Sequence, residues 1–185
     1  KAGVYEFGDE SPNIGQACDR AKYACDSISH RYDLMYRVFD ETLRRQIDRS
    51  KYIESHIESA IQNDWIKVYY QPIVHASSSE ICNLEALSRW DDPTYGFLPP
   101  GKFISVLESE RLIYKLTLCV VRLVLQDFRS LEKKGIPLVP VSVNLSRVDV
   151  FDPELEHTLD AIRKENNLSR DALKLEVTES AYVEN

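Results

Sequence analysis

The chain has 185 residues, of which 43% are hydrophobic and 29% charged, and its formal net charge is −7. Such a hydrophobic share can form a sizeable core, which excludes a mainly disordered chain. The acidic balance argues against polymeric nucleic acid as a partner, because neutralising its phosphates needs a basic patch. No apolar run approaches the about 20 residues that span a bilayer. We therefore expect no membrane contact from this segment and a cytoplasmic location, with any membrane anchor of the parent protein in missing N-terminal segments.

The first 64 residues predict a short α/β segment followed by a long helix. Alternating side chains indicate a strand at 2–7, and turn residues then lead into a helix at 14–27 and a second strand at 32–38. Asp40 can cap a helix that reaches about residue 63, because its apolar residues keep helical spacing. We interpret residues 40–64 as a linker helix between two domains, residues 1–39 and 65–185.

Residues 65–185 alternate strands with helices. Strands are expected at 67–75, 81–90, 138–144 and 172–179, helices over 101–134 and 152–166, and a loop at 91–100. We expect the aromatic residues of these strands, Tyr69 and Trp90 among them, in the core. The alternation predicts the α/β class with a mainly parallel sheet. Because a closed (β/α)8 barrel takes about 250 residues, the segment predicts a partial, TIM-like barrel whose last strand leaves an open edge, available for association or covered in a longer parent chain.

Side-chain alternation singles out three oxygen-bearing residues. Asn144 and Glu176 each point away from the apolar face of their strand, and Glu85 shares a strand face with Arg89, about 13 Å away. The three oxygen donors could converge at the C-terminal mouth of a barrel, where they would favour Mg²⁺ or Mn²⁺ and phosphodiester chemistry. Arg89 is suited to hold a phosphate. Polar residues at strand ends are often ordinary surface groups, and the pattern alone favours that simpler interpretation.

Five segments resemble the successive signature blocks of the EAL domain, in the order and spacing of that family. They are Tyr70–Val74 (YQPIV), Glu85–Trp90 (EALSRW), Gly96–Ile104 (GFLPPGKFI), Val143–Ser146 (VNLS) and Leu175–Ser180 (LEVTES). One Glu-Ala-Leu tripeptide would mean little, whereas five ordered blocks are specific. Residues 65–185 are therefore identified as the N-terminal half of an EAL domain.

The resemblance implies that the parent protein hydrolyses the bacterial second messenger cyclic di-GMP to linear pGpG, using two divalent ions, Mg²⁺ or Mn²⁺, at the mouth of a modified (β/α)8 barrel. It implies metal ligation by Glu85, Asn144 and Glu176, of which Glu85 is also catalytic, and a catalytic role for Glu179, which steadies a later loop. It implies substrate binding by Gln71, Leu87 and Arg89.

Two positions depart from the family pattern, and further family residues lie outside the chain. Leu107 and Arg111 stand where the family usually has Ala and Gly, which concerns packing and a turn. The paired aspartates, catalytic lysine and later glutamates of the family are expected beyond residue 185, so we expect the isolated chain to be inactive. The alternative is a catalytically inactive cyclic di-GMP receptor or protein-interaction module. A homodimer through the EAL domain, or through the module formed by residues 1–39, is a further candidate assembly.

Residues 1–39 resemble the end of a GGDEF domain, the diguanylate cyclase module that often precedes EAL. The matching stretch is Cys18–Asp26 (CDRAKYACD). Asp26 and His30 stand where the family places a Lys and an Arg against the GTP phosphates, and a carboxylate there reverses the sign of the Coulomb interaction. The resemblance implies a degenerate cyclase remnant with a regulatory or dimerising role. Arg31 could compensate in part, and Asp26 could equally serve only to solvate a helix end.

Overall fold

The computed structural model describes residues 1–8, 12–29, 31–166, 168–169 and 171–177, which form two compact units, residues 1–52 and 53–185. The predicted long helix is present as α2 (Glu41–Gln62), and the boundary between the units falls within it. Its second half carries Ile53, Ile57 and Ala60, which belong to the buried core of the second unit. Residues 53–62 are therefore part of that unit, whereas the sequence had suggested a separate linker.

The first unit packs helix α1 (Ile14–Asp26) beside a parallel pair of strands, β1 (Ala2–Val4) and β2 (Tyr36–Val38). Asn13 caps α1 through a capping box with Gln16. Both strands are shorter than predicted, because their pairing extends over only three residues each. A Cβ at Gly3 would lie 1.7 Å from the carbonyl oxygen of Ala21. The close approach of β1 to α1 therefore requires glycine at this position.

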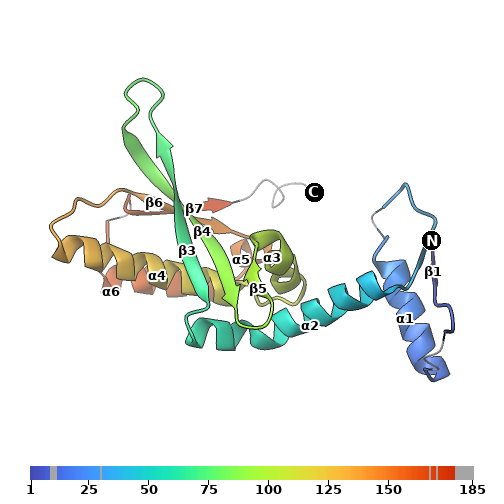
Figure 1. Cartoon of the computed structure of the whole chain (residues 1–185). Helices are drawn as coiled ribbons and strands as arrows, with labels where there is room; N and C mark the ends of the chain where they lie inside the picture. The colour runs from blue at the N-terminus through green and yellow to red at the C-terminus, as the bar shows by residue number, and fades with distance from the viewer. Residues whose placement is uncertain (9–11, 30, 167, 170, 178–185) are drawn as a thin grey trace. The chain divides into compact units, whose positions relative to one another are not determined.

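The second unit is built on a five-stranded sheet (Figure 1). Strands β3 (Ile66–Val74) and β4 (Ile81–Asp92) form an antiparallel hairpin, and β6 (Val141–Leu145) and β7 (Leu173–Val177) continue the sheet in parallel. Strand β5 (Gly96–Leu98) pairs with β4 inside the predicted loop. The carboxylate of Asp92 accepts hydrogen bonds from the amides of Thr94 and Tyr95, and Gly96 has a φ of 67°, so the chain reverses tightly enough to pair again. The described strands form an open sheet rather than a closed barrel.

Helices cover one face of this sheet. They are α3 (Pro100–Ser109), α4 (Ile113–Lys133), the short α5 (Arg147–Val150) and α6 (Pro153–Glu165). The core beneath α3 and α4 contains Trp90, Phe103, Val121 and Val143, each at most 2% exposed. Within the described ranges, no helix is both long enough and apolar enough to cross a membrane. The sequence did not predict α5, which is only four residues long.

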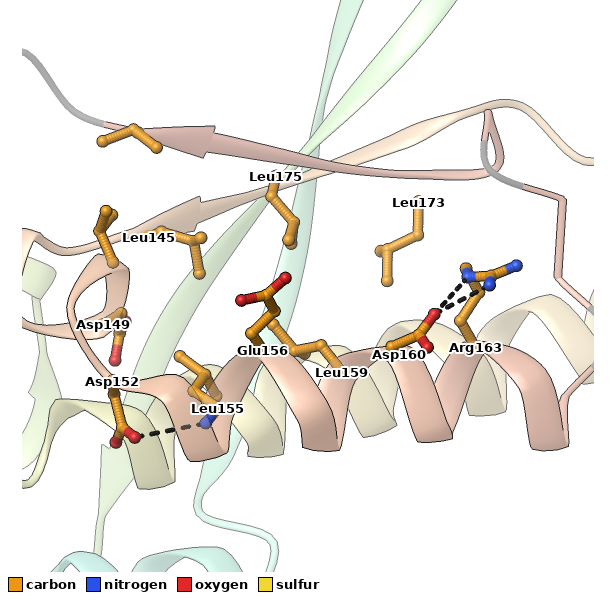
Figure 2. Close-up of a pocket in the computed structure, with 12 residues that line it drawn as sticks. Leu145, Asp149, Asp152, Leu155, Glu156, Leu159, Asp160, Arg163, Leu173 and Leu175 are labelled. Atoms are coloured by element: carbon orange, nitrogen blue, oxygen red, sulfur yellow. Dashed lines mark hydrogen bonds and ion pairs between the residues drawn. The ribbon is translucent and has the colours of Figure 1, made fainter.

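An apolar groove of about 370 Å³ lies between α6 and strands β6 and β7 (Figure 2). Leucines from both sides line it, and Leu175 remains 43% exposed. On the side of α6, Asp160 forms an ion pair with Arg163, and Asp152 caps the helix. The alternation predicted for β7 is therefore confirmed, because Leu173, Leu175 and Val177 all turn toward this groove. None of the residues predicted from the sequence to bind metal or substrate lines it.

Candidate functional site

Strand register places the predicted site residues on one face of the sheet. Gln71 lies opposite Glu85 on neighbouring strands β3 and β4, and Glu85 lies beside Ser142 on β6. Two residues further along, Asn144 of β6 lies beside Glu176 of β7. Side chains two residues apart on a strand share a face, so these residues face the same side. That side is opposite to the leucines of β7 that line the α6 groove.

The central contact of the site joins Asn144 to Glu85. The side-chain Nδ2 of Asn144 donates a 2.7 Å hydrogen bond to Oε1 of Glu85, across 59 positions of sequence. Both residues are half-buried. This bond uses one donor of the amide and one carboxylate oxygen, and it leaves Oδ1 of Asn144 and Oε2 of Glu85 to accept other partners.

Glu176 completes the set of three predicted ligands. It is exposed and lies in register with Asn144, at the about 4.8 Å spacing of neighbouring strands. Within the described residues, neither Glu85 nor Glu176 is paired with a cationic side chain. Two unneutralised carboxylates beside an amide oxygen are a donor set that fits a hard divalent cation.

The described residues contain no group of three or more histidine, cysteine, aspartate or glutamate side chains gathered as for a metal ion. The predicted set differs from such a group because one of its three members is an asparagine. The set is recognisable from the alternation of side chains along its strands and not from a cluster of acidic residues.

Arg89 follows Glu85 by four residues on β4, so the two side chains lie on the same face of the sheet. Its Nη1 donates to the backbone carbonyl of Ser88 at 2.8 Å, and its guanidinium carbon lies 5.9 Å from the centre of the Tyr69 ring. Tyr69 is 57% exposed, so its predicted core position is wrong, whereas Trp90 is fully buried as expected. Tyr69 and Arg89 line a shallow cavity of about 350 Å³ with Lys67. The lining also includes Asp91 and Phe97, so the cavity carries two cationic side chains and one carboxylate beside aromatic rings. Arginine beside an aromatic ring can contact a phosphate and a base of a nucleotide ligand.

Leu87 lies between Glu85 and Arg89 on β4 and is half-buried. It lines a small cavity of about 120 Å³ with Asn144, Ser146, Thr117 and other residues of α3 and α4. The predicted site residues of the described part of the chain lie on one face of the sheet, and Glu179 lies outside the described residues.

A buried polar pair lies next to Glu85 and was not anticipated. Nδ2 of Asn83 donates to Oγ of Ser142 at 2.5 Å, and Ser142 is fully buried. Ser142 lies in register with Glu85 on the same face of the sheet, so that face is buried at this point. A polar residue two positions before Glu85 on the same strand face is the signal that could have revealed the pair.

Two carboxyl groups near the end of β6 have perturbed acidity. Burial raises the pKa of Asp149, which is 3% exposed. Burial also raises the pKa of Glu108 on α3, and the charge of Asp149 adds to that rise. Sequence reasoning missed Asp149, although a Ser followed three residues later by an acidic side chain is the signature of a helix cap.

In the first unit, Arg31 forms a two-point contact with Asp33, with distances of 2.9 and 2.8 Å. This contact raises the pKa of Arg31 and lowers the pKa of Asp33 to about 2. The guanidinium that could have compensated for Asp26 is therefore bound to a neighbouring carboxylate. His30 lies outside the described residues.

Comparison with known proteins identifies the family. The family model described as the EAL domain matches residues 54–185. The chain is 31% identical over 183 residues to the cyclic di-GMP phosphodiesterase NbdA of Pseudomonas aeruginosa, covering 94% of this chain and 23% of that protein. It covers only 20% to 26% of the first three curated relatives that it matches.

Solved structures agree in fold. The PaMucR phosphodiesterase in complex with c-di-GMP matches with a TM-score of 0.65 and 26% identity, over 72% of this chain and 54% of that chain. The Vibrio cholerae LapD S helix-GGDEF-EAL structure bound to c-di-GMP matches with a TM-score of 0.67 and 17% identity, over 99% of this chain and 43% of that chain. With the family match covering most of its length, the chain belongs to the EAL domain family.

Proposed function

We propose that the parent protein is a metal-dependent phosphodiesterase that hydrolyses cyclic di-GMP to linear pGpG, and that this chain supplies part of its metal and substrate site. The observation that carries the proposal is the contact between Asn144 and Glu85, with Glu176 in register beside them. Relatives named as cyclic di-GMP phosphodiesterases and a phosphodiesterase structure in complex with c-di-GMP support the choice of substrate.

Glu85, Asn144 and Glu176 are the residues that would hold a divalent ion, Mg²⁺ or Mn²⁺. Such an ion neutralises charge on a phosphodiester and activates water. Glu85 has a second role in this proposal, because its hydrogen bond orients the amide of Asn144. Neither Glu85 nor Glu176 is paired with a cationic side chain among the described residues, so both carboxylates are open to a bound ion.

The substrate residues follow the same strands. Arg89 would contact a phosphate of cyclic di-GMP, and Leu87 and Gln71 would border the ligand. Gln71 and Glu85 are direct cross-strand neighbours, so a ligand that spans β3 and β4 can contact both. The exposed ring of Tyr69 beside Arg89 offers a flat surface to a purine base. Glu179 is proposed to support the site from beyond β7.

Metal binding by the 185-residue chain tests the ligand set. Mn²⁺ titration followed by electron paramagnetic resonance should show that Glu85→Gln weakens binding by about tenfold or more, because a charged oxygen ligand becomes neutral. Glu80→Gln is the matched control, since Glu80 lies in the exposed turn of the same hairpin. Equal Mn²⁺ affinity for Glu85→Gln and the unchanged chain would contradict the proposed ligand role.

Hydrolysis is tested in the complete parent protein, because the chain spans so little of its relatives. Chromatography of the products should show pGpG formed from cyclic di-GMP in the presence of Mg²⁺ or Mn²⁺, and Glu85→Gln should abolish it. Tight binding of cyclic di-GMP without any turnover would instead identify a receptor.

We also propose that the first unit is the end of a GGDEF-like module that has lost cyclase activity. The fold likeness to a GGDEF-EAL structure over 99% of this chain supports the module, and the pairing of Arg31 with Asp33 supports the loss. The complete protein should therefore make no cyclic di-GMP from GTP. Robust synthesis of cyclic di-GMP would refute this part of the proposal.

A further inference from the structure

The turn that ends β6 is held by a compact set of hydrogen bonds. Ser146 caps α5, and its hydroxyl accepts a hydrogen bond from the amide of Asp149 at 3.2 Å. The carboxylate of Asp149 accepts in return from the amide of Ser146 at 3.3 Å. These two bonds form a capping box, which fixes the direction in which the chain leaves the strand.

A residue from another helix joins this turn. The hydroxyl of Thr117, on α4, donates a 2.6 Å hydrogen bond to Oδ2 of Asp149, which is 32 positions away in sequence. Thr117 is 4% exposed and Asp149 is 3% exposed. Figure 2 shows Asp149 at one end of the α6 groove, close to Asp152. Loss of this bond would leave the carboxylate with one hydrogen-bond donor, the amide of Ser146. A buried carboxylate that loses a donor is destabilising.

Packing alone does not restrain this region. Thr117, Ser146 and Asn144 line the same cavity of about 120 Å³, together with Glu108 of α3. Side chains that line a cavity have fewer packing contacts than side chains in a filled core, so hydrogen bonds contribute more to their placement. Oδ1 of Asp149 is buried without a hydrogen-bond partner among the described residues. The buried carboxylate of Asp149 accepts hydrogen bonds from Thr117 and from the amide of Ser146, so its contacts lie in the turn.

We propose that Thr117 and Asp149 are positioning residues that set the side chain of Asn144. The buried bond joins α4 to Asp149, and the Asp149 carboxylate in turn holds the amide of Ser146, two residues beyond Asn144. This fixes the end of β6 so that the Asn144 amide meets Glu85 at hydrogen-bonding distance. This inference rests on the proposed function, because Asn144 is one of the three proposed metal ligands. Residues that orient metal ligands typically change affinity by about 10- to 100-fold when altered.

The test uses Thr117→Val, which keeps the side-chain shape and removes the hydroxyl, and Thr117→Ser, which restores it. Thr158→Val is the matched control, because the Thr158 hydroxyl donates only to the backbone of its own helix. In the metal-free 185-residue chain, NMR of the Asn144 side-chain amide reports its position, and Asn144→Asp assigns that signal. The indole N–H of Trp90, which donates to Asp92, is the reference for an intact sheet.

The Asn144 amide signals should move in Thr117→Val and return in Thr117→Ser, while the Trp90 indole signal stays unchanged. Mn²⁺ affinity should fall by about tenfold or more in Thr117→Val only. If Thr117→Val does not fold, Thr117→Ala replaces it. This variant also removes the hydroxyl but places no methyl group against the carboxylate of Asp149. Unchanged Asn144 signals in a folded hydroxyl-free variant would overturn the proposal.

The two proposals can fail separately. Absence of Mn²⁺ binding by the unchanged chain would refute the ligand set, and the metal-free NMR comparison would still decide whether Thr117 positions Asn144. Normal Mn²⁺ binding with unmoved Asn144 signals would refute the positioning role and leave the ligand set intact.

Discussion

The thiol of Cys119 shows how burial controls a single side chain. Cys119 lies on α4 and is 7% exposed, and its burial raises the pKa to about 11. Only about 0.1% of it is thiolate at pH 8, compared with about a quarter of an ordinary cysteine. Cys18 is exposed. Because only the thiolate attacks disulfides, the two thiols should react at very different rates.

We expect Ellman's reagent at pH 8 to modify Cys18 rapidly and Cys119 slowly, with all four cysteines reacting quickly in urea. Cys18→Ser should remove one fast equivalent, and Cys119→Ala should remove only a slow one. Raising the pH toward 10 should accelerate the reaction of Cys119, because a larger fraction of this thiol is then ionised. Loss of a fast equivalent in Cys119→Ala would show that the helix does not shield this thiol.

Among individual residues, the sequence predicted which face of its strand a side chain occupies better than it predicted contacts between distant elements. Alternation placed Glu85, Asn144 and Glu176 correctly, because a strand offers only two faces. The Thr117–Asp149 bond joins a helix to a turn 32 positions away, and no periodicity connects those positions. Tyr69 was assigned to the core because exposure at a sheet face cannot be read from one strand alone.

The turn between α3 and α4 carries strain that can be removed. Arg111 has a φ of 55°, the left-handed region that costs about 1–2 kcal/mol for a residue with a Cβ. Glycine avoids that cost but loses about 0.5–1 kcal/mol to its greater freedom in the unfolded chain. Arg111→Gly should therefore raise the free energy of unfolding by up to about 1.5 kcal/mol.

Urea unfolding monitored by the fluorescence of the buried Trp90 measures this change. Glu110→Gly is the control one residue earlier, where φ is −89° and glycine brings no relief. It should lower the free energy of unfolding. A destabilised Arg111→Gly would mean that the arginine side chain makes a contribution larger than the backbone strain.

Elements were predictable where their periodicity was long. Helices α2, α4 and α6 and strands β3, β4, β6 and β7 lie close to their predicted positions. Strand β5 and helix α5 have only three and four residues. Their existence depends on the Asp92 turn and the Ser146 cap, which act through individual hydrogen bonds rather than through a repeating pattern.

For the whole molecule, the α/β class followed from the alternation of elements and is present in the second unit. The prediction of a mainly parallel sheet is wrong, because β3–β4 and β4–β5 pair antiparallel, and only β4–β6 and β6–β7 pair parallel. The division of the chain at residue 52 was not predictable from helix periodicity, because α2 is continuous through it. Which half of a helix belongs to which core depends on distant partners such as Trp90 and Phe103.

The 59-residue separation between Asn144 and Glu85 has a consequence for synthesis on the ribosome. Glu85 emerges long before its partners, and loop closure over that distance must precede any shared ligand. A divalent ion that binds Glu85, Asn144 and Glu176 together would stabilise the folded sheet only after all three residues have been synthesised. Nascent chains arrested before residue 144 should be indifferent to such ions.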